Sequence, residues 1–329
     1  MKRIGLGLLL GLMMSTAHAT SATAAVTNAV EIQRFTWPDA KRNRDVPVKI
    51  YFPAATNGPF PLILFSHGLG GSREGYEYLG RHWAAHGYVS VHLQHAGSDQ
   101  TVWNGLAASD RMAAMRKAAA NPRNAINRPL DVSLALDELE RLKRENAAWQ
   151  RRLDLERVGV AGHSFGAYTT LAAAGQTFQP GLSRETTLAD SRVKAAIPMS
   201  APAPANKLRL EEVYARISIP CLHMTGTRDA SPIGDTKPEE RRLPFDHCRN
   251  SDQFLITFTD GDHMIFSGRP RRMGGGEQDA RFHELICESS TLFWDAYLRD
   301  DMEAKARLLK EFPDALGHAG KFEVKLLKR

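Results

Sequence analysis

The pentapeptide Gly162-His163-Ser164-Phe165-Gly166 constrains the fold of this chain more than any other segment. The apolar run at 158–161 precedes it and predicts a strand, while the small-residue run at 167–174 predicts a helix. A serine flanked by glycines in this setting predicts a sharp strand-to-helix turn that exposes the serine oxygen above a sheet. The glycines are needed because such a turn leaves no room for side chains beside the serine.

Strands and helices alternate on both sides of this turn. Polar and apolar residues alternate in segments 31–36 and 46–52, which predicts an antiparallel strand pair at the start of the domain. The later alternation predicts a mostly parallel central sheet with helices on both faces, within one α/β domain spanning 26–329. We expect further strands at 62–65, 88–93, 158–161, 193–199, 220–226 and 254–258, and helices at 76–86, from Pro129 onward, at 167–174 and at 279–297.

Three longer segments, 98–127, 176–191 and 231–249, interrupt the alternation. The first and third follow strand ends, and ligands of open α/β sheets bind beyond the carboxyl ends of the strands. We therefore expect these two segments to form walls of a cleft, with Trp103 as a candidate substrate-binding residue. The alternative, for any single residue in these two segments, is that it lies on the protein surface without contacting a ligand.

A serine hydroxyl needs a base to act as a nucleophile, and the base needs an acid that orients it. When the serine occupies this kind of turn, the acid and then the histidine follow later strands. Asp229 leaves the strand predicted at 220–226, with Asp235 as the nearest alternative. His263 follows the last predicted strand and, among the 12 histidines, it alone has the right order and setting. The predicted catalytic residues are therefore Ser164, Asp229 and His263.

The oxyanion that forms during acyl transfer needs two backbone N–H donors. The residue after the nucleophile, Phe165, supplies the first, and the glycine-rich loop at 66–71 supplies the second. We choose the N–H of Leu69 as the second donor, with Gly70 as the alternative. His67 is expected to hold this loop by hydrogen bonds.

Three segments carry a family resemblance: Leu64-Phe65-Ser66-His67-Gly68-Leu69-Gly70, Ala85-His86-Gly87-Tyr88 and the pentapeptide at 162–166. Over about 61–263, the chain resembles the platelet-activating-factor acetylhydrolase group of the α/β-hydrolase superfamily. That group is close to dienelactone-hydrolase-like esterases and more distant from cutinase-like polyester hydrolases. The resemblance implies an α/β-hydrolase fold, a serine esterase acting on short acyl groups such as acetyl, and the site roles given above. True dienelactone hydrolases use a cysteine nucleophile, so Ser164 argues against that reaction.

The first residues resemble a secretory signal peptide. Lys2 and Arg3 precede an uncharged apolar run at 4–14, and Ala17-His18-Ala19 offers a small-residue cleavage site. The run is too short for a membrane span, which needs about 20 residues. We expect a signal peptide at 1–19, a secreted or periplasmic protein, and no membrane span.

Composition narrows the possible partners. The hydrophobic fraction of 43% and charged fraction of 24% are those of an ordinary globular protein. The formal net charge of +6 comes from scattered basic residues, which argues against nucleic-acid binding. None of the three cysteines has Cys-x-x-Cys spacing, so no metal or cofactor is expected. An exported protein can form one disulfide from three cysteines, and Cys248 with Cys287 is the best candidate pair. Cys221 is then expected to be a buried free thiol.

These observations favour a metal-free hydrolase of small-molecule or lipid carboxylic esters. The alternatives are a broader lipase or polyester hydrolase, and a non-enzymatic binding protein on the same scaffold.

Overall fold

The computed structural model describes residues 30–54, 58–178, 186–268 and 276–327. The predicted signal peptide at 1–19 lies outside these residues. None of the helices in the described ranges is long and apolar enough to cross a membrane.

A nine-stranded sheet runs through the described part of the chain, in the order β1-β2-β4-β3-β5-β8-β9-β10-β11. Its strands are parallel from β4 to β10, and antiparallel strands flank both sides. A two-stranded hairpin of β6 and β7 lies apart from it. The strands are β1 (Val30–Asp39), β2 (Arg44–Pro53), β3 (Phe60–Ser66), β4 (Val89–Leu93), β5 (Leu153–His163), β6 (Thr177–Phe178), β7 (Thr186–Thr187), β8 (Val193–Met199), β9 (Cys221–Arg228), β10 (Gln253–Asp262) and β11 (Gly320–Lys325).

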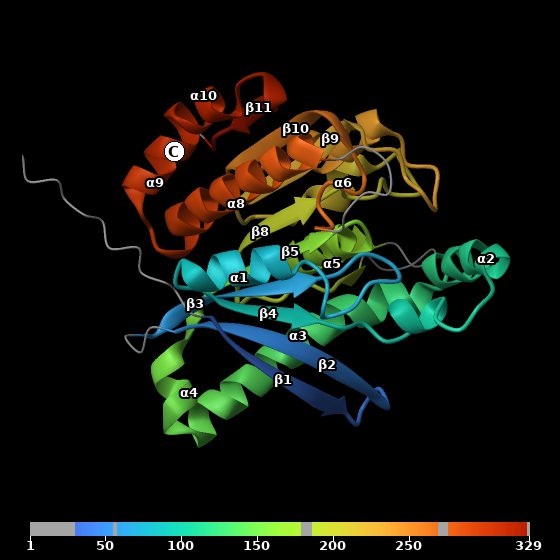
Figure 1. Cartoon of the computed structure of the whole chain (residues 1–329), viewed down its shortest axis with the longest axis vertical. Coiled ribbons are helices and arrows are strands. Elements are labelled where there is room, and N and C mark those ends of the chain that lie inside the picture. Colours follow the sequence, from blue (N-terminus) through green and yellow to red (C-terminus); the bar gives the residue numbers. More distant parts are fainter. Residues whose placement is uncertain (1–29, 55–57, 179–185, 269–275, 328–329) are drawn as a thin grey trace, which may run out of the picture.

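Helices cover both faces of the sheet (Figure 1). Helices α3 and α5 pack into the core on one face, and α1 and α8 into the core on the other. The α-helices are α1 (Glu77–Ala85), α2 (Ala108–Ala119), α3 (Pro122–Glu145), α4 (Ala147–Arg152), α5 (Phe165–Ala174), α6 (Leu210–Tyr214), α7 (Leu243–His247), α8 (Gly276–Leu298), α9 (Met302–Lys310) and α10 (Phe312–Leu316), and the short 3₁₀ helices are η1 (Gln100–Val102), η2 (Pro238–Arg242) and η3 (Gly317–Ala319).

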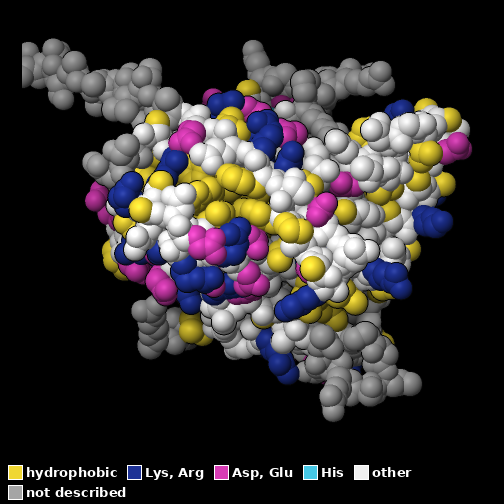
Figure 2. Space-filling view, turned by 90° about the horizontal axis from the view of Figure 1, so that it is seen from below, with side chains coloured by type: hydrophobic (Ala, Val, Ile, Leu, Met, Phe, Trp, Pro, Cys, Tyr) yellow, Lys and Arg dark blue, Asp and Glu magenta, His cyan; other side chains and the backbone are white. Residues whose placement is uncertain are grey.

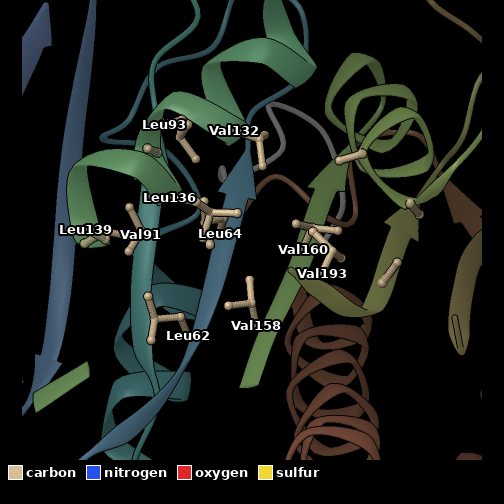
Figure 3. Packing of buried hydrophobic residues seen from close by; sticks show 14 of the residues in the cluster. Leu62, Leu64, Val91, Leu93, Val132, Leu136, Leu139, Val158, Val160 and Val193 are labelled. Atoms are coloured by element: carbon tan, nitrogen blue, oxygen red, sulfur yellow. The ribbon is translucent and has the colours of Figure 1, made fainter. Parts of the chain in front are cut away.

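The central strands supply side chains to both cores, because successive residues of a strand point to opposite faces. In β3, Leu62 and Leu64 belong to the core under α3, while Ile63 and Phe65 belong to the core under α1 and α8. Figure 3 shows Leu62 and Leu64 beside Val91 of β4, with side chains of α3 lying over them. The continuous apolar run of β3 therefore reflects burial on both faces.

Charged side chains of both signs are intermixed on the surface drawn in Figure 2. Local ion pairs form between side chains of opposite charge: Arg141 of α3 contacts Glu138 and Glu145, and Arg192 contacts Asp190.

The predicted α/β class, the initial antiparallel pair and every predicted strand are confirmed. The predicted start of a helix near Pro129 is wrong. Helix α3 begins at Pro122, because Asn121 caps it by accepting a hydrogen bond from the N–H of Arg123, and Pro129 lies inside it. Strand β11, which adds an antiparallel neighbour to β10, was not predicted.

The predicted Cys248–Cys287 disulfide is also wrong. All three cysteines are free thiols. Cys248 belongs, with Cys221, to the core under α3 and α5, whereas Cys287 of α8 packs against the core on the opposite face. The sheet therefore separates the two residues that the prediction paired.

Candidate active site

Ser164 occupies the turn between β5 and α5, at the carboxyl end of the central strand. Its φ of 57° lies in the region that non-glycine residues rarely adopt. Gly166 approaches β3 so closely that a Cβ there would lie 1.8 Å from the carbonyl oxygen of Ser66. At Gly162, a Cβ would lie 2.4 Å from the carbonyl oxygen of Gly166. Both glycines are therefore required by close backbone contacts around the serine.

The three predicted catalytic side chains lie together. Asp229 directly follows β9 and His263 directly follows β10. Nε2 of His263 lies 2.9 Å from Oγ of Ser164, and Nδ1 of His263 lies 2.7 Å from Oδ1 of Asp229. A carboxylate only accepts hydrogen bonds, so Nδ1 donates to Asp229 and Nε2 is left to accept from the serine hydroxyl.

The carboxylate of Asp229 is fully buried and held by several groups. Its Oδ2 accepts hydrogen bonds from the hydroxyls of Ser200 (2.5 Å) and Thr225 (2.9 Å). Nε of Arg241 lies 3.3 Å from its Oδ1. These contacts fix the plane of the carboxylate and partner its charge, which a buried ionised group requires.

Arg241 is a residue of this site that the sequence did not reveal. It lies in η2, inside the segment 231–249, and only 1% of its side chain is exposed. It donates to the carbonyl oxygens of Asp229 (3.1 Å) and Ser200 (2.9 Å), and its Nη2 lies 3.3 Å from Nδ1 of His263. Burial lowers the pKa of Arg241. No motif marks it, because its position depends on how η2 folds back against β9.

The two predicted oxyanion donors flank the serine. Phe165 follows it at the N-terminus of α5, and Leu69 lines the same cleft as Ser164. Within the described residues, neither backbone N–H has a hydrogen-bond acceptor. The N–H of Gly70, the alternative donor, is already engaged by the carbonyl oxygen of Ser98 at 2.8 Å. Of these two candidates in the loop, the N–H of Leu69 is therefore the one that remains available to bind an oxyanion.

Two of the hydrogen-bonded connections that hold the loop containing Leu69 involve histidines. His67 accepts from the N–H of His95 (3.1 Å) through Nε2 and donates to the carbonyl oxygen of Gly68 (2.6 Å) through Nδ1, which confirms its expected bracing role.

The second connection joins this loop to the loop of His263. The hydroxyl of Tyr76 accepts from the N–H of Gly68 (3.3 Å) and donates to Nδ1 of His163 (2.8 Å). His163 in turn donates from Nε2 to the carbonyl oxygen of His263 (2.9 Å). Burial lowers the pKa of His163 well below its ordinary value, so the ring is neutral and can both accept and donate.

A cleft of about 750 Å³ opens beside Ser164. All three interrupting segments contribute to its wall, as predicted for 98–127 and 231–249, and a stretch at 202–207 that was not predicted joins them. The cleft is lined by Leu69, Arg116, Ala119, Ala120, Ala125, Ser164, Phe165, Tyr168, Gln176, Pro202, Ala203, Pro204, Ala205, Lys207, Ser231, Pro232, Ile233, Gly234, Asp235, Thr236 and Glu240.

Trp103 lies on a smaller hollow of about 260 Å³, which also reaches Ser164 and His263. Its indole N–H donates to the carbonyl oxygen of Gly70 at 2.8 Å. The predicted substrate-binding residue therefore packs against the loop of Leu69 rather than lining the larger cleft. In the described ranges, no group of three or more His, Cys, Asp or Glu side chains is placed to hold a metal ion.

The family model and the curated relatives that match this sequence are all described as platelet-activating factor acetylhydrolases. The family model described as platelet-activating factor acetylhydrolase, isoform II, matches residues 38–118. A platelet-activating factor acetylhydrolase of Canis lupus familiaris is 28% identical over 65% of this chain and 50% of its own length. Its counterpart from Cavia porcellus is 28% identical over 38% of this chain and 34% of its own length. The chain thus matches between a third and a half of the length of these curated relatives.

Proposed function

We propose that this chain, an α/β-hydrolase similar in sequence to the platelet-activating factor acetylhydrolases, hydrolyses carboxylic esters through Ser164. One observation carries the proposal: Ser164, His263 and Asp229 form a continuous hydrogen-bonded series at the mouth of a cleft. The unengaged N–H groups of Leu69 and Phe165 beside the serine support it.

In the proposed reaction, the hydroxyl of Ser164 attacks the ester carbonyl while Nε2 of His263 takes its proton. Asp229 holds the ring and stabilises the imidazolium, and the N–H groups of Leu69 and Phe165 bind the oxyanion. His263 then donates the proton to the departing alcohol, which leaves an acyl group on Ser164. Water, deprotonated by His263, attacks the acyl group and releases the acid.

Similarity to the platelet-activating factor acetylhydrolases favours esters with short acyl groups, such as acetyl esters. A second candidate, a broader lipase or polyester hydrolase, is favoured by one observation. A further hollow of about 450 Å³ adjoins the cleft and shares five lining residues with it: Ala125, Tyr168, Gln176, Pro204 and Ala205. Its wall includes Ile126, Phe178, Leu188 and Val213, so a long apolar chain that starts at Ser164 has a place to lie.

A panel of acetate, octanoate and longer esters tests both candidates on the wild type and on Ser164→Ala. We expect turnover by the wild type and none by the variant; activity that survives in Ser164→Ala contradicts the proposed mechanism. A wild type that neither turns over any ester nor reacts with a fluorophosphonate probe would instead indicate a binding protein.

Acyl-chain length is tested by Ala125→Trp, which narrows the passage between the two hollows. If long apolar chains use the second hollow, kcat/KM falls for octanoate and stays unchanged for acetate. Ala147→Trp, on the exposed surface of α4, is the matched control. If Ala125→Trp changes kcat/KM equally for octanoate and acetate, the second hollow does not hold the acyl chain, and the result argues for an enzyme of short acyl groups.

Export is a further part of the proposal, and the pattern of Lys2, Arg3, the apolar run at 4–14 and Ala17-His18-Ala19 supports it. Mass spectrometry of the chain expressed in its natural host tests it. A mass that begins after Ala19 supports export, and retention of residues 1–19 contradicts it.

A further inference from the structure

Arg128 of α3 is completely buried and lies close to Phe165, one of the two proposed oxyanion donors. Each of its three nitrogens has a hydrogen-bond acceptor. Nε donates to the hydroxyl of Thr169 (2.8 Å), Nη1 donates to the hydroxyl of Ser98 (2.9 Å), and Nη2 donates to the carbonyl oxygen of His67. All three acceptors are uncharged, which is unusual for a buried guanidinium.

No carboxylate oxygen of a described residue lies within 4 Å of these nitrogens. Asp131, one helical turn further along α3, is paired with Arg42 and Arg44 instead. Burial lowers the pKa of Arg128 to about 9, which leaves it positively charged at neutral pH. Burying a cation without a direct counter-ion is costly, so its retention needs a reason other than stability.

The contacts of Arg128 converge on the two proposed oxyanion donors. On one side, it holds the carbonyl oxygen of His67, two residues before Leu69. On the other side, it holds the hydroxyl of Thr169, which itself donates to the carbonyl oxygen of Phe165 at 2.9 Å. Its guanidinium also lies 4.6 Å from the centre of the Phe165 ring. One rigid, planar group therefore connects the loop after β3 to the first turn of α5.

We propose that Arg128 is a positioning residue for the oxyanion site: it fixes the spacing of the Leu69 and Phe165 N–H groups and places close to them a positive charge that no carboxylate contacts directly. This inference rests on the proposed function of Ser164. A fixed cation close to the site stabilises a negative charge that exists only during the reaction, so it acts on kcat rather than on substrate binding.

The test compares Arg128→Met and Arg128→Lys with the wild type. Arg128→Met removes the charge and all three hydrogen bonds, and we expect kcat to fall about 10²–10³-fold, as for loss of an oxyanion donor. A lysine keeps the charge but its single ammonium group cannot reproduce the planar fork, so we expect a loss of about 10-fold. In both variants KM should stay within about threefold of the wild-type value, because ground-state binding is unchanged.

Two further variants separate catalysis from folding. Lys49→Met is the matched control, because Lys49 is also a buried cation, but it lies in β2 and pairs with Glu74 and Glu77. We expect it to lower the unfolding temperature and leave kcat unchanged. Thr169→Val removes only one acceptor of Arg128, so it provides the test if Arg128→Met does not fold; its kcat should fall with KM unchanged.

A folded Arg128→Lys or Thr169→Val protein with wild-type kcat would overturn the inference while leaving the proposed function intact. A wild type without Ser164-dependent turnover would overturn both. A kcat that falls equally in Lys49→Met and in the Arg128 variants would also overturn it, since the effect would then be one of general stability.

Discussion

Replacing Gly166 by alanine tests how tightly the serine turn is built. The added methyl group would lie 1.8 Å from the carbonyl oxygen of Ser66, 2.7 Å from its carbonyl carbon and 3.0 Å from the carbonyl oxygen of His67. All three atoms belong to the backbone at the end of β3, so no side chain can rotate away to make room. The change therefore pushes α5 away from β3.

The size of this displacement follows from the contact distance. Ordinary contact begins at 3.4 Å, so β3 and α5 must separate by about 1.6 Å. Overpacking of this kind typically costs about 1–3 kcal/mol of unfolding free energy, and a 1 Å displacement of reacting groups can cost about 10² in rate. Because the proposed donors Leu69 and Phe165 lie on opposite sides of this contact, we expect kcat/KM to fall at least about 10²-fold.

The assay is ester hydrolysis measured together with thermal unfolding. For a chain of this length, a loss of 3 kcal/mol corresponds to a fall of about 5 °C in Tm. Gly75→Ala is the matched control, because Gly75 also lies near the site but a Cβ there meets only the carbonyl oxygen of Ser72, at 3.5 Å. Wild-type kcat/KM and Tm in Gly166→Ala would refute the reasoning.

Three other predictions concern the acid, the surface charges and the thiols. Asp229→Asn should lower kcat about 10³–10⁴-fold, measured by steady-state hydrolysis, because His263 loses the charge that stabilises its protonated form; a loss under tenfold contradicts the assigned role. Glu74, which accepts two hydrogen bonds from Arg34, has its pKa lowered to about 2, so its contribution to stability is complete above pH 4.5 and disappears as the pH falls toward 2. Glu74→Gln should therefore flatten the fall in Tm between pH 5 and pH 2, and an unchanged slope would argue against it. Thiol titration should detect three free cysteines in denaturant and only the partly exposed Cys287 in the native protein, whereas one thiol in denaturant would indicate a disulfide.

The positions of the three proposed catalytic residues could be predicted because they follow the order of the strands. Ser164, Asp229 and His263 each come directly after a strand whose apolar run is visible in the sequence, and parallel strands bring their carboxyl ends to one edge of the sheet. The glycine-rich loop after β3 could be predicted for the same reason. Local pattern and strand order were sufficient for these residues.

The groups that support them could not be predicted, because their positions depend on long-range packing. Arg128 lies in a helix and Arg241 in a segment rich in charged residues, and arginines in such settings are usually exposed. The disulfide prediction failed because it excluded Cys221 as a buried thiol and paired the two remaining cysteines, and the sheet that separates Cys248 from Cys287 is not visible in their spacing.

The cleft walls have a consequence for how such a protein can diversify. They come mainly from segments that follow strands, at 98–127, 202–207 and 231–249, whereas Ser164 and His263 directly follow strands of the sheet itself. Insertions and deletions in the walls can therefore accumulate without moving the side chains of the proposed catalytic residues. Arg241 limits this freedom, because it belongs to a wall segment and also contacts Asp229. A sequence change in this part of the wall therefore also affects the proposed catalytic acid.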